Sequence, residues 1–152
     1  MKLAEALIER AELQKKNAQL YQRIERNALV QEGDAPAEEP AELMAEYEGN
    51  MERLLLLIRR INATNSVAPF GQGETVADAI ARRDCLGAKI KAYRGIYEAA
   101  AIRQDRYSQK EVKFVRCVDV KAVQDTINRL SKEYRETDTK LQAINWTTDL
   151  VD

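Results

Sequence analysis

A heptad pattern of apolar residues in the C-terminal part of the chain limits the folds open to it. The apolar side chains there recur alternately three and four residues apart, at Val120, Val123, Ile127, Leu130, Tyr134, Leu141 and Ile144. Thr137 alone interrupts the pattern, and Asp119 precedes it as a candidate N-cap. This spacing lines one side of an α-helix, as in coiled coils. Such a helix spans about 40 Å at roughly 1.5 Å per residue, which predicts long helices packed side by side.

Three earlier segments have the same helical character, because each carries an apolar stripe and is bounded by Pro or Gly. The four predicted helices cover about residues 3–30, 41–62, 75–106 and 119–146. We therefore predict an all-α fold, an elongated antiparallel bundle of four long helices with coiled-coil packing. A chain of 152 residues is long enough to form this bundle as a single helical domain over residues 1–152.

A β-prone run separates the third and fourth predicted helices. From Val112 to Val118, side chains with strand propensity alternate along the chain. The run predicts a short β-like excursion before the last helix, which could pair with Val67 to Phe70 or with its copy in another subunit.

The residue content excludes several classes of function. The chain has 24 Lys and Arg, 25 Asp and Glu, and no His. Such balanced charge gives nucleic acids and anionic membranes no strong attraction to the whole molecule, so we expect neither partner. Without His there is no Ser-His-Asp triad, no Cys-His pair, and no zinc or di-iron site of the His type. We therefore predict no metal and no cofactor.

The two cysteines are predicted to be structural. Cys85 and Cys117 lie far apart in the sequence and form no CxxC pair. A reducing compartment would keep both as thiols, and no histidine is present to activate a thiolate. The sequence therefore favours buried thiols that act as small apolar residues.

The N-terminal region argues for a cytoplasmic protein. Glu5 and Glu9 interrupt the apolar core that a signal peptide would need. The longest apolar run, Leu54 to Ile58, is far shorter than the roughly 20 residues of a membrane-spanning helix. Because this run is apolar on every side of its helix, it should be buried inside the bundle or between subunits. We therefore expect a homo-oligomer.

Two possible functional motifs in the sequence have simpler interpretations. Glu38, Glu39 and Glu42 match part of the Glu-Glu-x-x-Glu spacing of all-helical nucleotide pyrophosphohydrolases, but Pro40 lies inside the motif and no Glu-x-x-Asp partner follows. Carboxylates near a helix N-terminus explain them better. Basic residues from Arg94 to Lys113 alternate with tyrosines, but Asp105 and Glu111 dilute their charge. A solvated helix end is therefore favoured over a nucleic-acid surface.

Charged residues on the predicted seams are the best hint of a binding site. Arg83 falls on the apolar seam of the third helix with Asp84 beside it, and a charge at such a position needs a partner. The fourth helix carries Arg135 and Asp138 on either side of the interruption at Thr137.

Several short blocks of sequence resemble a family of small bacterial proteins often labelled septicolysin. The blocks span nearly the whole chain: residues 2–7 (KLAEAL), 9–11 (ERA), 30–33 (VQEG), 61–65 (INATN), 83–84 (RD), 106–108 (RYS) and 141–148 (LQAINWTT). Thr137 departs from the pattern, since the family suggests Leu there. The resemblance implies an all-helical, coiled-coil-rich fold, and the label implies a cytolysin. The residues do not favour lysis, because they offer no amphipathic β-hairpins and no Trp-rich segment.

Packing features dominate this sequence, so the first function predicted is that of a structural or interaction protein acting as a homo-oligomer. The alternative is an enzyme or small-ligand-binding protein with a site at a subunit interface; a membrane-active cytolysin is disfavoured. No catalytic residue is assigned. The candidate ligand site is a polar cluster of Arg83, Asp84, Arg106, Tyr107, Arg135 and Asp138.

Overall fold

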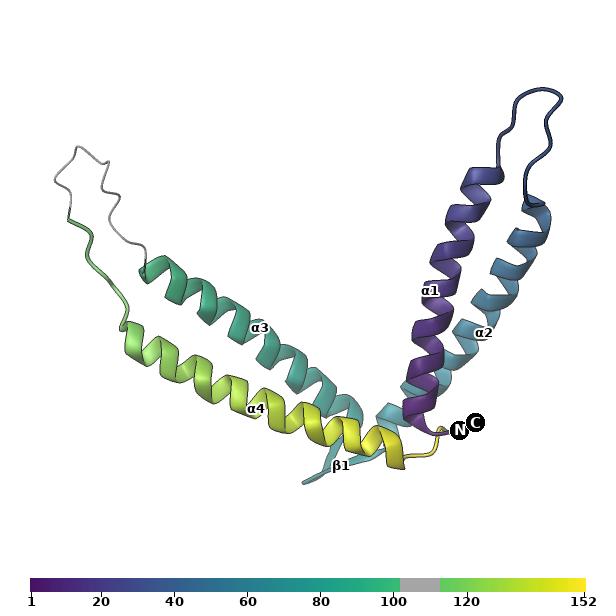
Figure 1. Cartoon of the computed structure of the whole chain (residues 1–152). Helices are drawn as coiled ribbons and strands as arrows, with labels where there is room; N and C mark the ends of the chain where they lie inside the picture. Colours follow the sequence, from purple (N-terminus) through teal and green to yellow (C-terminus); the bar gives the residue numbers. More distant parts are fainter. Residues whose placement is uncertain (102–112) are drawn as a thin grey trace. The chain divides into compact units, whose positions relative to one another are not determined.

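The computed structural model describes residues 1–101 and 113–152, and these form four long helices and one two-stranded sheet (Figure 1). The elements are α1 (Leu3–Asn27), α2 (Pro40–Val67), β1 (Pro69–Gly71), β2 (Glu74–Thr75), α3 (Val76–Ala100) and α4 (Val120–Thr147). The predicted all-α class with four long helices is confirmed.

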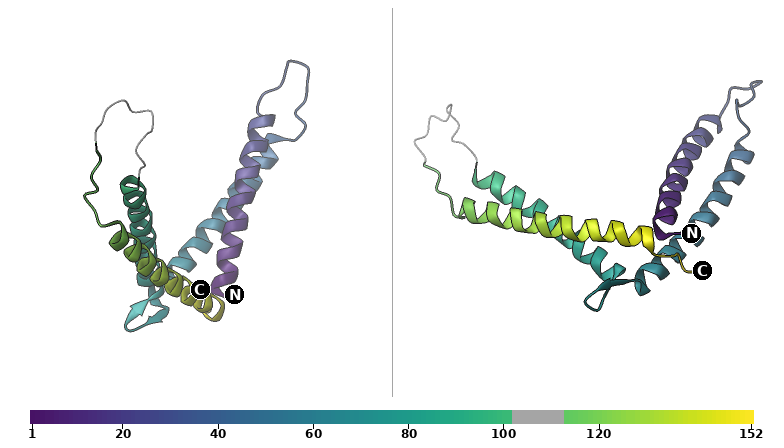
Figure 2. Two further views of the ribbon diagram at one scale, coloured as in Figure 1. Left: turned by 60° about the vertical axis from the view of Figure 1, so that its left-hand side comes forward. Right: turned by 60° about the horizontal axis from the view of Figure 1, so that its bottom comes forward.

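The chain divides into two compact units, each containing a pair of helices. Unit 1 comprises Met1–Val76 and Gln142–Asp152, and unit 2 comprises Ala77–Leu141. Figures 1 and 2 show α1 beside α2 and α3 beside α4. In the first pair, Glu9 of α1 contacts Arg53 of α2, whereas Lys16, later in α1, contacts Glu46, earlier in α2. The packing is therefore antiparallel, as predicted. A single domain over residues 1–152 stays a prediction.

The seam of α4 follows the heptad pattern closely. Its buried residues are Val123, Ile127, Leu130, Thr137 and Leu141. Asp119 caps the helix as predicted, since its Oδ1 accepts a hydrogen bond of 3.1 Å from the backbone N–H of Ala122. In unit 2, Leu130 packs with Leu86 and Ile90 of α3, and the rings of Tyr93 and Tyr134 cover this cluster.

The C-terminal residues complete the core of unit 1. Leu150 is buried against residues of α1 and α2: Leu3, Ala6, Leu57 and Ile61. The backbone N–H of Leu150 donates to the carbonyl of Met1 at 2.9 Å, and that of Val151 donates to Oγ1 of Thr64 at 3.0 Å. Lys2 pairs with Asp149 at 2.7 Å. These bonds fix the last residues onto the N-terminal helical hairpin.

The predicted end of the third helix, at about residue 106, lies outside the described residues, and α3 is described to Ala100. Two other helix ends differ from the prediction because side chains decide them. α1 ends at Asn27 rather than about residue 30, because Asn27 donates from Nδ2 to the carbonyl of Arg23 and accepts at Oδ1 from the N–H of Glu38. α2 continues to Val67 rather than about residue 62. There the hydroxyl of Thr64 donates to a carbonyl of the preceding turn, so a polar residue is accommodated within the helix.

The predicted β-like excursion before the last helix is present, at an earlier position. β1 and β2 form an antiparallel pair between α2 and α3, and β1 overlaps the predicted pairing segment at residues 67–70. Their turn requires positive φ at Gly71, Gln72 and Gly73. Residues 113–118 form no strand, which corrects the placement in that run; Val112 lies outside the described residues.

Candidate functional site

Arg83 joins α3 to α4 through two carboxylates. Its Nη1 donates to Oδ1 of Asp138 at 2.9 Å, and its Nη2 and Nε donate to Oδ1 of Asp84, each at 3.3 Å. The Arg83 side chain is 24% exposed. Burial opposes its charge, but the hydrogen bonds to Asp138 and Asp84 outweigh that cost and raise the pKa of Arg83. The seam charge therefore has the partners that its position required.

The hydroxyl of Thr137, in the seam of α4, accepts a hydrogen bond from a neighbouring arginine. Its side chain is buried at 5% exposure, and its Oγ1 accepts a hydrogen bond of 3.1 Å from Nη1 of Arg82. An apolar residue at this position would leave Arg82 without that acceptor. The interruption of the heptad pattern and the charged cluster are thus parts of one polar layer.

The structure brings together only some of the six residues of the predicted polar cluster. The structure brings Arg83, Asp84 and Asp138 into contact, whereas Arg135 lines the adjacent groove. Arg106 and Tyr107 lie outside the described residues. The location of this cluster at a subunit interface stays a prediction.

The groove beside this cluster, here called the cationic groove, lies between α3 and α4 and has a volume of about 380 Å³. Its lining residues are Gly87, Ile90, Lys91, Arg94, Ser131, Tyr134 and Arg135. Among the residues that the structure describes, no acidic side chain lines it. A Cβ at Gly87 would lie 3.4 Å from Cε2 of Tyr134, in ordinary van der Waals contact, so glycine leaves this part of the ring uncovered.

Sequence reasoning missed the cationic groove because no motif marks it. Gly87 and Arg94 directly follow Leu86 and Tyr93, which belong to the apolar seam of α3 in unit 2. Ser131 likewise follows Leu130 on α4. These positions flank the seam on one side, so a wheel projection of both helices in antiparallel register could have found the groove.

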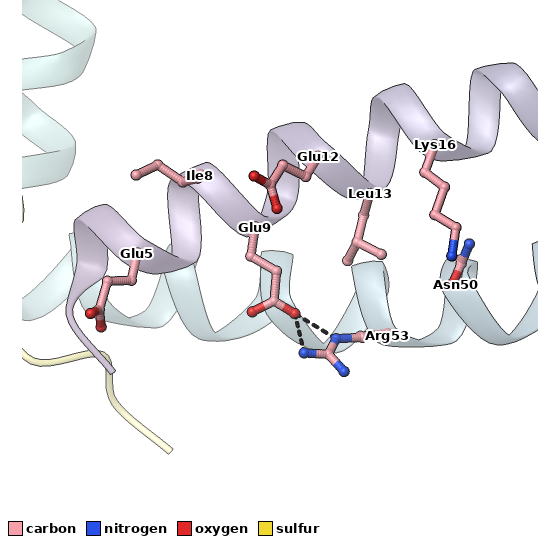
Figure 3. A pocket seen from close by; sticks show the side chains of 8 residues that line it. All are labelled: Glu5, Ile8, Glu9, Glu12, Leu13, Lys16, Asn50 and Arg53. Carbon is pink, nitrogen blue, oxygen red and sulfur yellow. Dashed lines mark hydrogen bonds and ion pairs between the residues drawn. The ribbon is translucent and has the colours of Figure 1, made fainter.

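A second groove lies on α1 and α2 in unit 1 (Figure 3). Its volume is about 570 Å³, and its lining includes Glu5, Glu9, Glu12, Lys16 and Arg53. Figure 3 shows the Glu9 carboxylate directed at the Arg53 guanidinium, with which it forms an ion pair. Within the described ranges, no three His, Cys, Asp or Glu side chains gather in a way that could hold a metal ion. This side of the helical hairpin is best described as ion-paired.

The opposite side of the α1–α2 hairpin is apolar. The ion pairs Glu9–Arg53, Lys16–Glu46 and Arg23–Glu38 all lie along one flank of the seam. The other flank, here called the apolar face, comprises Leu7, Ala11, Gln14, Ala18, Tyr21, Met44, Met51, Leu55 and Ile58. The side chains of Tyr21 and Leu55 are 56% and 58% exposed.

Acidic side chains interrupt the apolar face at two points only, in the middle and at one end. Glu48 lies midway along α2, and Glu25 lies at the end of the face, where it accepts a hydrogen bond from Tyr21. The face is thus mostly uncharged and exposed in the single chain.

A pair of amides lies in the seam beside this face. Asn17 is 6% exposed, and its Nδ2 contacts Sδ of Met51 at 3.2 Å. Oδ1 of Asn17 and Nδ2 of Asn50 are both buried without a hydrogen-bond partner. Such orphaned polar atoms are costly in a packed helical seam.

The cysteines are exposed, which corrects the prediction of buried thiols. Cys85 lies on α3 outside its seam, and Cys117 lies in the irregular segment before α4. Neither forms a disulfide.

Across residues 1–101 and 113–152, every helix is too short or too polar to traverse a lipid bilayer.

Comparison with known proteins assigns the family. The model of the family of unknown function DUF6847 matches residues 10–150. The chain belongs to this family. Among solved structures, it is similar to a functionally unknown conserved protein from Corynebacterium diphtheriae, with 43% sequence identity, a TM-score of 0.95 and coverage of 99% of each chain. No curated protein matches the chain.

Membership of DUF6847 gives no support to the septicolysin label. Neither the family description nor the solved structure carries that label, and the cytolysin activity that it implies gains no support. The similarity to the corynebacterial protein extends over both helical hairpins, since it covers almost all of the chain.

Proposed function

We propose that the protein is a cytoplasmic structural or interaction protein that acts as a homo-oligomer, assembled through the apolar face of the α1–α2 hairpin. The observation that carries this proposal is the contrast between the two flanks of one helix pair. One flank carries three ion pairs, whereas the other exposes Met51 and Leu55 with few charges. Exposed apolar surface of this extent is typical of an interaction site.

A second copy of the chain is the occupant that this face fits. Its α1 side presents small residues, Ala11 and Ala18, at a seven-residue spacing, and its α2 side presents the large residues Met44, Met51 and Leu55. A twofold axis would place α2 of one copy against α1 of the other, so that large side chains pack over small ones. The part of the face at Ala11 and Ala18 could therefore receive large side chains of a second copy.

The size of the face also suits a stable dimer. α1 has 25 residues, which makes it about 37 Å long, and two adjacent helices are about 20 Å wide. The face thus offers about 700 Å² per copy, close to the roughly 800 Å² that each partner buries in a standard interface.

The test compares two neighbouring leucines of α2. Leu55 and Leu56 are 58% and 61% exposed, but Leu55 adjoins Met51 on the apolar face whereas Leu56 adjoins Arg53 on the ion-paired flank. We expect Leu55→Glu to convert the oligomer to monomer and Leu56→Glu to leave its mass unchanged, measured by light scattering at low and high salt. A monomeric native protein, or equal effects of both variants, would refute assembly through this face.

A second candidate function, small-ligand binding, is favoured by one specific observation. The cationic groove places cations from two helices around a partly apolar floor, next to the cluster at Arg83. This arrangement suits a ligand better than a purely structural contact does.

A further inference from the structure

We propose that the cationic groove between α3 and α4 binds a small organic molecule that carries a phosphate group. The inference concerns unit 2 alone and does not depend on assembly through the apolar face. It rests on three observations: the positive charge of the groove, the ion pairs that bind neighbouring carboxylates to Arg83, and the apolar floor of the groove.

The groove concentrates uncompensated positive charge. Lys91 and Arg94 of α3 and Arg135 of α4 all line it and are all exposed. Among the described residues, none of the three forms an ion pair. Glu98 stands four residues after Arg94, a spacing that permits pairing on a helix, yet the two form no ion pair either.

The ion pairs of Arg83 help to explain why Arg135 has no acidic partner. Asp138 stands three residues after Arg135, within reach of an ion pair on the same helix. Its Oδ1 is instead bound to Arg83 at 2.9 Å, and Asp84 also contacts Arg83. Both carboxylates are thus paired with Arg83, and neither forms an ion pair with Arg135. The cluster predicted as a site thus acts as a support for the groove.

The donors match a multiply charged oxyanion. Two guanidinium groups offer planar pairs of N–H donors, Lys91 adds an ammonium, and Ser131 adds a hydroxyl. Three like charges around one groove repel one another, and an anion with a charge near −2 relieves that repulsion better than a single carboxylate does. A phosphate monoester has this charge at neutral pH.

The floor of the groove provides for the organic part of the ligand. Ile90 is buried at 7% exposure, and the Tyr134 ring packs against the same core cluster. Gly87 leaves that ring accessible, since a Cβ there would reach within 3.4 Å of it. A volume of about 380 Å³ exceeds what phosphate alone fills and lies in the lower range of small-molecule pockets. The ligand should therefore place a flat or apolar group over Ile90 and Tyr134.

A small molecule fits this surface better than a nucleic acid does. Asp84 and Glu98 carry negative charge at positions that flank Lys91 along α3. A polyanion that followed the helix would meet these carboxylates, whereas a compact phosphate ester would not. A separate groove between the same helices also contains basic side chains, Arg82, Lys89 and Arg129, but Glu133 lines it as well.

The experiment titrates the full chain with phenyl phosphate, inorganic phosphate and phenol, following amide chemical shifts by NMR. We expect phenyl phosphate to bind most tightly and to shift residues of the groove. Arg135→Gln should weaken its binding about tenfold, because it removes charge-assisted hydrogen bonds. The matched control is Arg129→Gln, the same change on another side of α4, which should leave the affinity unaltered. Gly87→Ala, whose methyl group would cover part of the Tyr134 ring, should weaken phenyl phosphate more than inorganic phosphate.

Several outcomes would overturn the proposal. These are equal affinity of the Arg135 and Arg129 variants, equal binding of phenol and phenyl phosphate, and no shifts at the groove at 10 mM ligand. Tighter binding of a single-stranded DNA than of phenyl phosphate at equal phosphate concentration would replace the small molecule with a nucleic acid. Because each variant's mass can be checked by light scattering, loss of assembly and loss of ligand binding are distinguishable.

Discussion

Replacing Asn17 by Leu should stabilise the protein, although it removes a buried polar group from the α1–α2 seam. Oδ1 of Asn17 is buried without a partner, which costs about 1–3 kcal/mol. Its Nδ2 contacts only the sulfur of Met51, a weak acceptor. Leu has a similar shape and adds apolar burial at a heptad position. We expect Asn17→Leu to raise the free energy of unfolding by about 1–2 kcal/mol, or about 2–8 °C in Tm for a chain of this size.

Urea denaturation followed by far-UV circular dichroism measures this change, with the slope m expected to stay constant. Gln19→Leu is the control, because Gln19 is an exposed amide on the same helix and its replacement should alter stability by less than about 0.5 kcal/mol. Asn50→Leu should couple to Asn17→Leu in a double-mutant cycle, since Asn50 adjoins Met51 and has its own orphaned Nδ2. If Asn17→Leu destabilises the protein by 1 kcal/mol or more, Asn17 has a hydrogen-bond partner and the reasoning fails.

Two further predictions concern the ends of helices and of the chain. Asp119→Ala should lower stability by about 1 kcal/mol, because the N–H of Ala122 loses its cap; urea titration checks this, and a change below 0.3 kcal/mol would mean that water replaces the carboxylate. The hydrogen bond from Lys2 lowers the pKa of Asp149 below its ordinary value of 3.8. Its stabilising contribution is therefore full above that value and is lost as the pH falls through the folded pKa. Denaturation midpoints from pH 6 to pH 2 should fall more steeply for the native protein than for Lys2→Gln, and parallel curves would contradict this.

The seam of α4 could be predicted from sequence because two independent rules agree there. Heptad spacing defines one side of the helix, and Asp119 marks its start. The seam of α2 was less predictable. The run Leu54–Ile58 is apolar all round, so spacing alone does not decide which of its residues face α1, and the structure buries Leu54 and Leu57. The register there is fixed by contacts with α1, which no local pattern of α2 encodes.

The candidate site was predictable in part for a similar reason. A charge on an apolar seam needs a partner, and this rule correctly singled out Arg83. Its partner Asp138 could be named because it lies on the facing helix near the polar interruption at Thr137. The cationic groove was not predictable, because Lys91 and Arg94 come together with Arg135 only once the register of α3 against α4 is known.

The composition of unit 1 has a consequence for biosynthesis. This unit joins residues 1–76 to residues 142–152, with all of unit 2 between them in the sequence. A ribosome makes the α1–α2 hairpin early but cannot supply Leu150, which fills its core, until residues 77–141 have been translated. During translation the core of the hairpin therefore stays incomplete, and its apolar residues are accessible to chaperones that bind nascent chains. Unit 2, by contrast, is contiguous and can fold as soon as α4 emerges.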